Sequence, residues 1–121
     1  MAEILILIAE DELPIAQLVA ELVRDLGATP LLASDGRQAL AVARAQHPAL
    51  LVTDLMMPHL SGVELIAALR ADGLGPIPTI LMTAVGLPAA QAAGADAVLA
   101  KPFDLDALEA LVRRFVELPV A

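Results

Sequence analysis

The chain has 121 residues, and 15 acidic against 7 basic side chains give it a net charge of −8 at neutral pH. Its length predicts one domain with a sizeable core, and its scattered arginines offer no basic face for binding nucleic acid. The absence of cysteine excludes disulfides and thiolate metal sites, and no apolar run approaches the roughly 18 to 20 residues of a membrane span. Because the N-terminal stretch lacks the basic region of a signal peptide, we expect a cytoplasmic protein.

Strand-like and helix-like patterns alternate from the start of the chain. The apolar run at residues 4–9 predicts a strand buried on both faces. The following segment predicts a helix, with Pro14 in its first turn and Gly27 as its stop. Leucines recur in that helix near helical spacing, at Leu13, Leu18, Leu22 and Leu26. Residues 28–33 predict a weaker strand, which Pro30 places at a sheet edge.

The same alternation continues to the C-terminus. Further strands are predicted at residues 49–53, 77–83 and 96–100. Capping-box patterns begin two helices: Asp35 with Gln38, ending near Gln46, and Ser61 with Glu64, ending near Ala71. Asp104 caps a last helix whose predicted inner face comprises Leu105, Leu108, Leu111, Val112 and Phe115. Five strands alternating with helices indicate an α/β fold, a doubly wound parallel sheet covered by helices on both faces.

Chemically useful side chains stand where the predicted strands end. Glu10 and Asp11 follow the first strand, Asp54 the third, Thr83 ends the fourth and Lys101 follows the fifth. In open α/β sheets a ligand site lies outside the carboxyl ends of the strands. Each residue alone has an ordinary explanation, such as a helix-start acid or a solvated lysine. Their joint appearance at four strand ends predicts a site.

The residue types at this edge indicate a cation and a phosphoryl group. Carboxylates held close together repel, which protonation or a cation must offset. An oxygen-only set without histidine or cysteine favours Mg²⁺, Mn²⁺ or Ca²⁺. Lys101 is the only lysine of the chain, and its ammonium can reach a carboxylate and a phosphoryl oxygen as a point charge. The Thr83 hydroxyl can donate a hydrogen bond to the same oxygen.

Four segments carry a family resemblance: ILIAEDE, LLVTDLMMPHLSGVELI, IPTILMTA and AGADAVLAKPFDLDAL. They resemble the receiver domain of two-component response regulators, the chemotaxis-type phosphoacceptor fold, and with the intervening helices they cover essentially the whole chain. The resemblance implies a flavodoxin-like strand order 2-1-3-4-5. It also implies a single receiver domain over residues 1–121, and we expect no output domain.

The resemblance implies a role for each strand-end residue. Asp54 would be the phosphoacceptor in a stand-alone receiver of a phosphorelay. Mg²⁺, with Mn²⁺ as an alternative, would be bound by Asp11, by Asp54, by Glu10 directly or through water, and by the backbone carbonyl of Met56. A sensor histidine kinase or a histidine phosphotransfer protein would supply the phosphoryl group. The phosphorylated protein would act through a further protein partner, not through nucleic acid or membrane insertion.

The remaining implied roles concern the switch. Thr83 would be the hydroxyl that turns toward the phosphoryl group, and Lys101 would pair with Asp54 and then with the phosphoryl oxygens. The Lys101–Pro102 peptide bond would be cis, which X–Pro bonds tolerate. Receiver domains usually carry an aromatic residue where this chain has Val98, so the switch would be atypical.

Two further features bear on the interpretation. The stretch between Thr83 and Lys101 is about one helical turn shorter than in the family, so we expect a short or displaced fourth helix. With Val98, this favours an alternative, a pseudo-receiver that binds partners with little or no phosphorylation-dependent switching. A metal-dependent phosphatase would need a second Asp where Met56 stands, so we do not expect an enzyme.

Overall fold

The computed structural model describes residues 3–73, 77–84 and 94–119 and contains one parallel sheet. Its strands are β1 (Leu5–Ala9), β2 (Thr29–Ala33), β3 (Leu50–Asp54), β4 (Thr79–Thr83) and β5 (Ala97–Ala100). The described helices are α1 (Leu13–Asp25), α2 (Gly36–Gln46), α3 (Gly62–Ala71) and α5 (Leu105–Phe115). The strand order β2-β1-β3-β4-β5 confirms the predicted topology. The expected short fourth helix falls on residues 85–93, outside the described residues.

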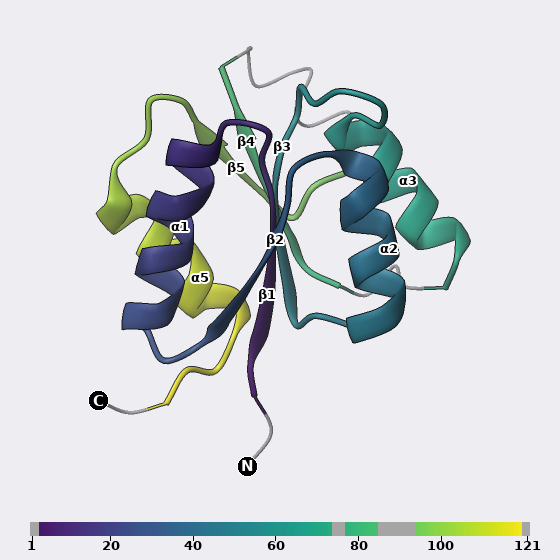
Figure 1. Cartoon of the computed structure of the whole chain (residues 1–121). Helices are drawn as coiled ribbons and strands as arrows, with labels where there is room; N and C mark the ends of the chain where they lie inside the picture. The colour runs from purple at the N-terminus through teal and green to yellow at the C-terminus, as the bar shows by residue number, and fades with distance from the viewer. Residues whose placement is uncertain (1–2, 74–76, 85–93, 120–121) are drawn as a thin grey trace.

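Helices cover both faces of the sheet, as the strand patterns predicted. α1 and α5 lie on one face, and α2 and α3 lie on the other (Figure 1). Along β1, Ile6 and Ile8 pack with the α1 and α5 side chains, whereas Leu7 and Ala9 join the core under α2 and α3. Burying such a branched side chain contributes about 1.5–3 kcal/mol, so the two cores fix the sheet between its helices. No helix in the described ranges is long and apolar enough to cross a membrane.

The position of β2 at the sheet edge confirms the interpretation of Pro30. The Thr29 amide donates to the carbonyl oxygen of Ile4 at 2.7 Å, so Thr29 faces β1. Backbone groups of alternate residues point to opposite sides of a strand, so Pro30 faces the free edge. Its missing N–H therefore removes no hydrogen bond from the sheet, and it leaves the outer edge with one donor fewer for another strand.

Two of the regularly spaced leucines of α1, and Leu105 from the predicted inner face of the last helix, are exposed. Leu13 and Leu18 face solvent, and α1 buries Ala16, Val19, Ala20 and Val23. The five-residue step from Leu13 to Leu18 turns a helix by about 500°, so these leucines do not share one stripe. On α5, Leu108 and Val112 are buried as predicted, and Leu111 and Phe115 pack partly buried against the core. Leu105 in the first turn is exposed.

The two capping patterns have different outcomes. At Ser61 both bonds of the box form: the Glu64 amide donates to Ser61 Oγ at 3.2 Å, and the Ser61 amide donates to Glu64 Oε1 at 3.0 Å. Asp35 accepts from the Gln38 amide at 2.8 Å, but Gln38 Oε1 accepts from the Ser34 amide at 2.6 Å. The box at the start of α2 therefore runs from Ser34 to Gln38, one residue longer than predicted. Both helices begin where expected.

A glycine brings the start of α3 against the end of β3. The Gly62 amide donates to the carbonyl oxygen of Leu55 at 2.9 Å. A Cβ at position 62 would lie 2.5 Å from the carbonyl oxygen of Asp54 and 3.1 Å from Leu55 Cα. Real side chains do not approach backbone atoms so closely, which explains glycine at this position. The contact fixes the backbone that carries Asp54.

We predict that Gly62→Ala lowers the free energy of unfolding by about 1–3 kcal/mol, because the added methyl group overlaps the Asp54 carbonyl. Helix propensity alone predicts the opposite sign, a gain of up to about 1 kcal/mol. Urea denaturation measures the difference. Ala67→Ser, at an exposed position of the same helix, is the control and stays within about 0.5 kcal/mol. A Gly62→Ala protein as stable as the parent contradicts the close approach.

Candidate functional site

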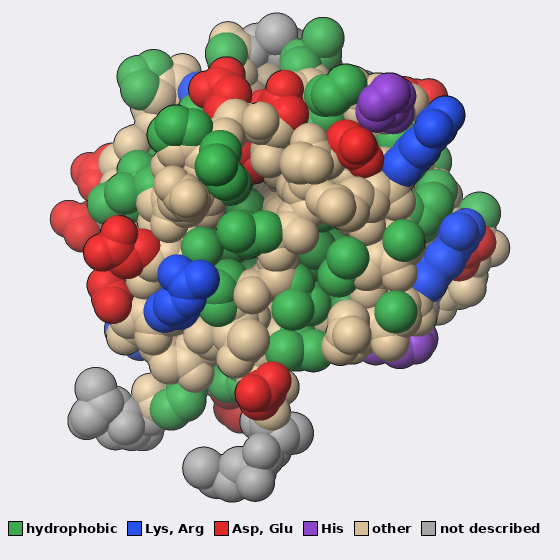
Figure 2. Space-filling view, viewed as in Figure 1, with side chains coloured by type: hydrophobic (Ala, Val, Ile, Leu, Met, Phe, Trp, Pro, Cys, Tyr) green, Lys and Arg blue, Asp and Glu red, His purple; other side chains and the backbone are tan. Residues whose placement is uncertain are grey.

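The carboxyl ends of the strands gather the predicted residues at one edge of the sheet. Glu10, Asp11 and Asp54 each offer an oxygen atom, and these atoms lie within 4.8 Å of one another. Figure 2 shows acidic side chains gathered over this upper edge of the molecule. Thr83 ends the neighbouring strand β4, and Lys101 directly follows β5. Parallel strands in the observed order therefore unite residues that are up to 91 positions apart in sequence.

Lys101 is the centre of this arrangement. Its Nζ lies 2.9 Å from Asp54 Oδ2 and 3.1 Å from Glu10 Oε2. The side chains are 15% exposed for Lys101, 10% for Asp54 and 0% for Glu10. Burial at this level removes most of the solvent screening that weakens surface ion pairs. The ammonium thus bridges the ends of β1 and β3.

Two pKa values reflect this bridge. Burial raises the pKa of Glu10, and the negative charge of Asp54 raises it further, against the lowering effects of the Glu12 amide and Lys101. Burial alone would lower the pKa of Lys101, but the hydrogen bonds to Asp54 and Glu10 outweigh it and raise that pKa. Lys101 is therefore a cation at neutral pH, and with the Glu12 amide it opposes the rise in the pKa of Glu10.

The other predicted residues surround this pair. Asp11 is exposed beside Glu10, so it presents its carboxylate to solvent. Thr83 is almost fully buried, and its carbonyl oxygen accepts from the Lys101 amide at 2.8 Å. The Met56 amide lies 3.4 Å from Asp54 Oδ1, longer than an ordinary N–H···O bond, and its side chain is exposed. The Lys101–Pro102 peptide bond is cis.

The donor atoms fit a hard divalent cation. The three carboxylates, with no nitrogen or sulfur ligand among them, match the preference of Mg²⁺ for a few carboxylates completed by water. One ammonium balances only one of three negative charges, so a divalent cation would neutralise the cluster. The exposed Asp11 provides the approach from solvent.

Val98 occupies a packed position in β5. It pairs with Leu81 of β4 and contacts a small core cluster formed by Leu55, Ile66 and Leu81. This places Val98 on the α3 side of the sheet, away from α1 and α5. No aromatic ring is present at this position, as the sequence shows.

The structure also reveals an apolar surface beside the site. Leu18 of α1 and Leu105 of α5 are exposed there and line one cavity. A cavity next to them is lined by Ile15, Leu18, Ala84, Lys101, Pro102 and Phe103. Counting the alanines and valines of α1 would have revealed its buried face and left these leucines outside.

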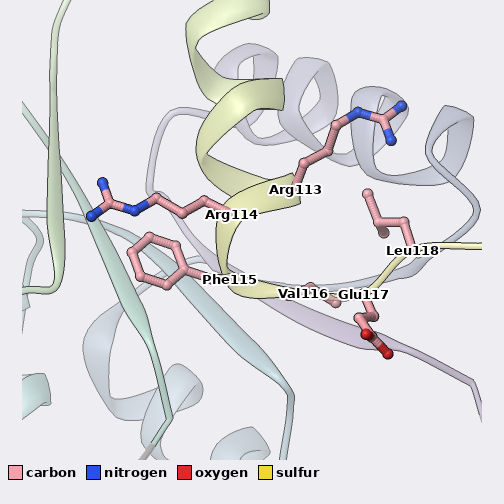
Figure 3. Close-up of a pocket in the computed structure, with 6 residues that line it drawn as sticks. All are labelled: Arg113, Arg114, Phe115, Val116, Glu117 and Leu118. Atoms are coloured by element: carbon pink, nitrogen blue, oxygen red, sulfur yellow. The ribbon is translucent and has the colours of Figure 1, made fainter.

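A second cavity lies away from the strand ends, at the C-terminal end of α5 (Figure 3). None of the predicted site residues lines it. Arg113 pairs with Glu109 at 3.0 Å, and the Arg114 guanidinium lies 5.5 Å from the centre of the Phe115 ring. Both arginines are thus engaged with their own helix, and the strand-end cluster remains the candidate site.

Comparison with known proteins points to one family. Residues 6–113 match the family model of the response regulator receiver domain. The chain is 35% identical over 117 residues to the probable transcriptional regulatory protein TcrX of Mycobacterium tuberculosis, which covers 90% of this chain and 50% of that protein. The chain spans about half the length of the curated relatives it matches.

Solved structures agree with this match. The chemotaxis protein CheY4 of Vibrio cholerae has a TM-score of 0.87 at 29% identity, over 95% of this chain and 100% of that chain. The receiver domain of the sensor histidine kinase PA1611 of Pseudomonas aeruginosa has a magnesium ion coordinated in its active-site cleft. It has a TM-score of 0.83 at 32% identity, over 94% of this chain and 98% of that chain.

We predict that Lys101→Met lowers the free energy of unfolding at pH 7 by about 1–3 kcal/mol, because Glu10 and Asp54 lose their buried counter-charge. The loss shrinks as the pH falls from 7 toward 5. The pKa of Glu10 is raised, so its carboxyl takes up a proton at a higher pH than an unperturbed glutamate does. Once it is neutral, the absence of the Lys101 ammonium no longer leaves a buried charge unpaired at this residue. Urea denaturation at several pH values, without divalent cations, measures the effect.

The matched control is Arg113→Met, which breaks the exposed pair with Glu109. It changes the free energy of unfolding by about 0.5 kcal/mol or less, with no dependence on pH in this range. Equal losses for the two variants would contradict a buried counter-charge role for Lys101.

Proposed function

Since the chain belongs to the family of response regulator receiver domains, we propose that Asp54 accepts a phosphoryl group from a histidine kinase or a histidine phosphotransfer protein. The observation that carries this proposal is the contact of 2.9 Å between Lys101 Nζ and Asp54 Oδ2 beside two further carboxylates. A receiver domain is a phosphoacceptor signalling module and not an enzyme.

The transfer is a displacement at phosphorus. An oxygen of the Asp54 carboxylate attacks, the P–O bond forms, and the P–N bond to the donor histidine breaks. The imidazole leaves with the bonding electron pair and takes a proton from solvent. Charge accumulates on the three equatorial oxygens, so catalysis consists mainly of positioning and charge neutralisation. Lys101 already stands beside the attacking carboxylate, and the Thr83 hydroxyl comes from the next strand along the sheet.

Asp11, Asp54 and the backbone carbonyl of Met56 are the groups that would hold Mg²⁺, with Mn²⁺ as a substitute, and Glu10 would contribute directly or through water. When bound, the cation neutralises charge on the phosphoryl oxygens. The chain's own residues then orient the group: Lys101 pairs with one phosphoryl oxygen and Thr83 donates to another. The phosphoryl group of the product carries roughly 1.5–2 negative charges at pH 7, which can bias a nearby two-state surface.

The decisive experiment is phosphorylation by acetyl phosphate with Mg²⁺, followed by intact-mass spectrometry. The parent protein gains the mass of one phosphoryl group, and Asp54→Asn gains none. Asp11→Ala loses the dependence on Mg²⁺, including the rise in melting temperature that a native-state ligand causes by mass action. Asp25→Asn, an acid at the far end of α1, behaves like the parent. Equal phosphorylation of the parent and Asp54→Asn would refute the proposal.

A second candidate, the pseudo-receiver, is favoured by one observation. Val98 leaves the switch position without a ring that could rotate, because valine has one dominant rotamer. Comparing hydrogen exchange of the phosphorylated and unphosphorylated proteins distinguishes the switching receiver from the pseudo-receiver. A phosphoreceiver with a working switch changes protection in β5 and α5, whereas an interaction module keeps the same pattern.

The phosphoryl donor would dock on the apolar surface beside Asp54. A donor histidine must reach Asp54 from solvent, so its protein covers neighbouring residues. Leu18 on α1 lines the cavity that Lys101 also lines, and Leu105 on α5 shares a second cavity with Leu18; both leucines are exposed. An amphipathic helix is a partner whose apolar face suits such a surface.

We predict that Leu18→Asp lowers the rate of phosphotransfer from the cognate kinase or phosphotransfer protein by at least about tenfold, the effect of losing about 1.4 kcal/mol. Phosphorylation by acetyl phosphate, which needs no docking, stays unchanged. Leu32→Asp on the edge strand β2 is the matched control, because Leu32 is 42% exposed and Leu18 is 44% exposed. Equal effects of the two substitutions would place the donor elsewhere.

The proposed organisation is a stand-alone receiver in the cytoplasm, one domain over residues 1–121. Its curated relatives are about twice as long, so the native product must be measured. An antibody against this domain should detect a product of 12.5 kDa in cell extracts. A product of about twice that size would show that an output domain is attached.

A further inference from the structure

Glu10 uses both of its carboxylate oxygens within the chain. Oε1 accepts a hydrogen bond from the Glu12 amide at 3.1 Å, and Oε2 accepts from Lys101 Nζ at 3.1 Å. Its side chain is fully buried. The neighbouring Asp11, in contrast, is exposed. The two adjacent acids therefore differ in their surroundings: Glu10 contacts Lys101 inside the protein, and Asp11 contacts solvent.

The strand order explains why long side chains meet here. β1 and β5 are separated by β3 and β4, which is three strand spacings, or about 14–15 Å. Lys101 extends from the end of β5 across the ends of β4 and β3, and Glu10 extends from the end of β1 toward it. An aspartate at position 10 would be shorter by one methylene, about 1.5 Å. It would leave a gap beyond hydrogen-bond length between its oxygen and the ammonium.

We propose that Glu10 is a positioning residue for Lys101: its carboxylate holds the ammonium beside Asp54, so that an incoming phosphoryl group meets a cation already in place. This inference rests on the proposed function of Asp54. It assigns direct metal binding to Asp11 and Asp54, and leaves Glu10 to contribute to the metal through water. It also gives the glutamate at position 10 a purpose that a shorter acid does not serve.

The single lysine makes the proposal testable without any phosphoryl transfer. Lys101 is the only lysine side chain of the chain, so its acylation by an amine-reactive acetylating reagent can be assigned by peptide mass spectrometry. Without metal, Glu10→Asp should raise the acylation rate of Lys101 severalfold, because the ammonium loses one of its two partners. Glu12→Asp is the matched control: it makes the same shortening two residues away, at an exposed side chain, and leaves the rate unchanged.

Phosphorylation by acetyl phosphate at saturating Mg²⁺ provides the second measurement. Glu10→Asp should lower the rate by roughly 10- to 100-fold, as displacement of a catalytic group by about 1 Å does. The Mg²⁺ concentration that gives half of the rise in melting temperature should shift far less than the phosphorylation rate. In a Lys101→Met background, Glu10→Asp should cause no further loss, because both substitutions remove the same placed cation.

The opposite outcomes overturn the proposal. Unchanged Lys101 acylation in Glu10→Asp refutes the positioning role, and so does an equal rate loss with and without Lys101. A Mg²⁺ midpoint that shifts as much as the phosphorylation rate assigns Glu10 to the metal instead. If Glu10→Asp does not melt cooperatively, Glu10→Gln, which keeps the length and removes the charge, takes its place with the same expected acylation result. A parent protein that fails to phosphorylate at Asp54 refutes the proposed function and leaves the acylation comparison intact.

Discussion

The site depends on one electrostatic constraint: three carboxylates meet at one sheet edge, and a single ammonium is available to offset them. Glu10 and Asp54 are held by Lys101 at 3.1 and 2.9 Å, while Asp11 remains open to solvent. The folded chain therefore keeps an excess of negative charge in a place that is only partly hydrated. The lysine stabilises this arrangement, and the remaining negative charge attracts a divalent cation.

The strand order determines which residues can satisfy this constraint. Because β1 and β3 are neighbours, Glu10 and Asp54 come together directly, whereas Lys101 must cross the end of β4. A long flexible stem with a compact charge achieves this, and a planar guanidinium would present a fork in place of a point charge. The one lysine among seven basic residues is thus explained by reach and by the shape of its charge.

Much of this could be predicted from the sequence, for identifiable reasons. Strands buried on both faces produce unbroken apolar runs, and Ser61 with Glu64 marks a helix start through its own hydrogen bonds. The strand-end rule placed Asp54 and Lys101 at the same edge. The exposure of Leu18 was not predictable from leucine spacing, since the smaller Val19 and Ala20 form the buried stripe. The Glu10–Lys101 contact depends on distances across the sheet, which no local pattern contains.

If Asp54 is phosphorylated as proposed, the same geometry offers a route from Asp54 to β5 that needs no moving ring. A backbone hydrogen bond links Thr83 of β4 to Lys101 at the end of β5: the Thr83 carbonyl oxygen accepts from the Lys101 amide at 2.8 Å. A phosphoryl group that draws the Thr83 hydroxyl and the Lys101 ammonium toward itself therefore pulls on two residues joined by one hydrogen bond. Val98, three residues before Lys101, is carried on the same strand. In this chain the signal would travel as a displacement of β5, which would pass to the cluster of Leu55, Ile66 and Leu81 through Val98.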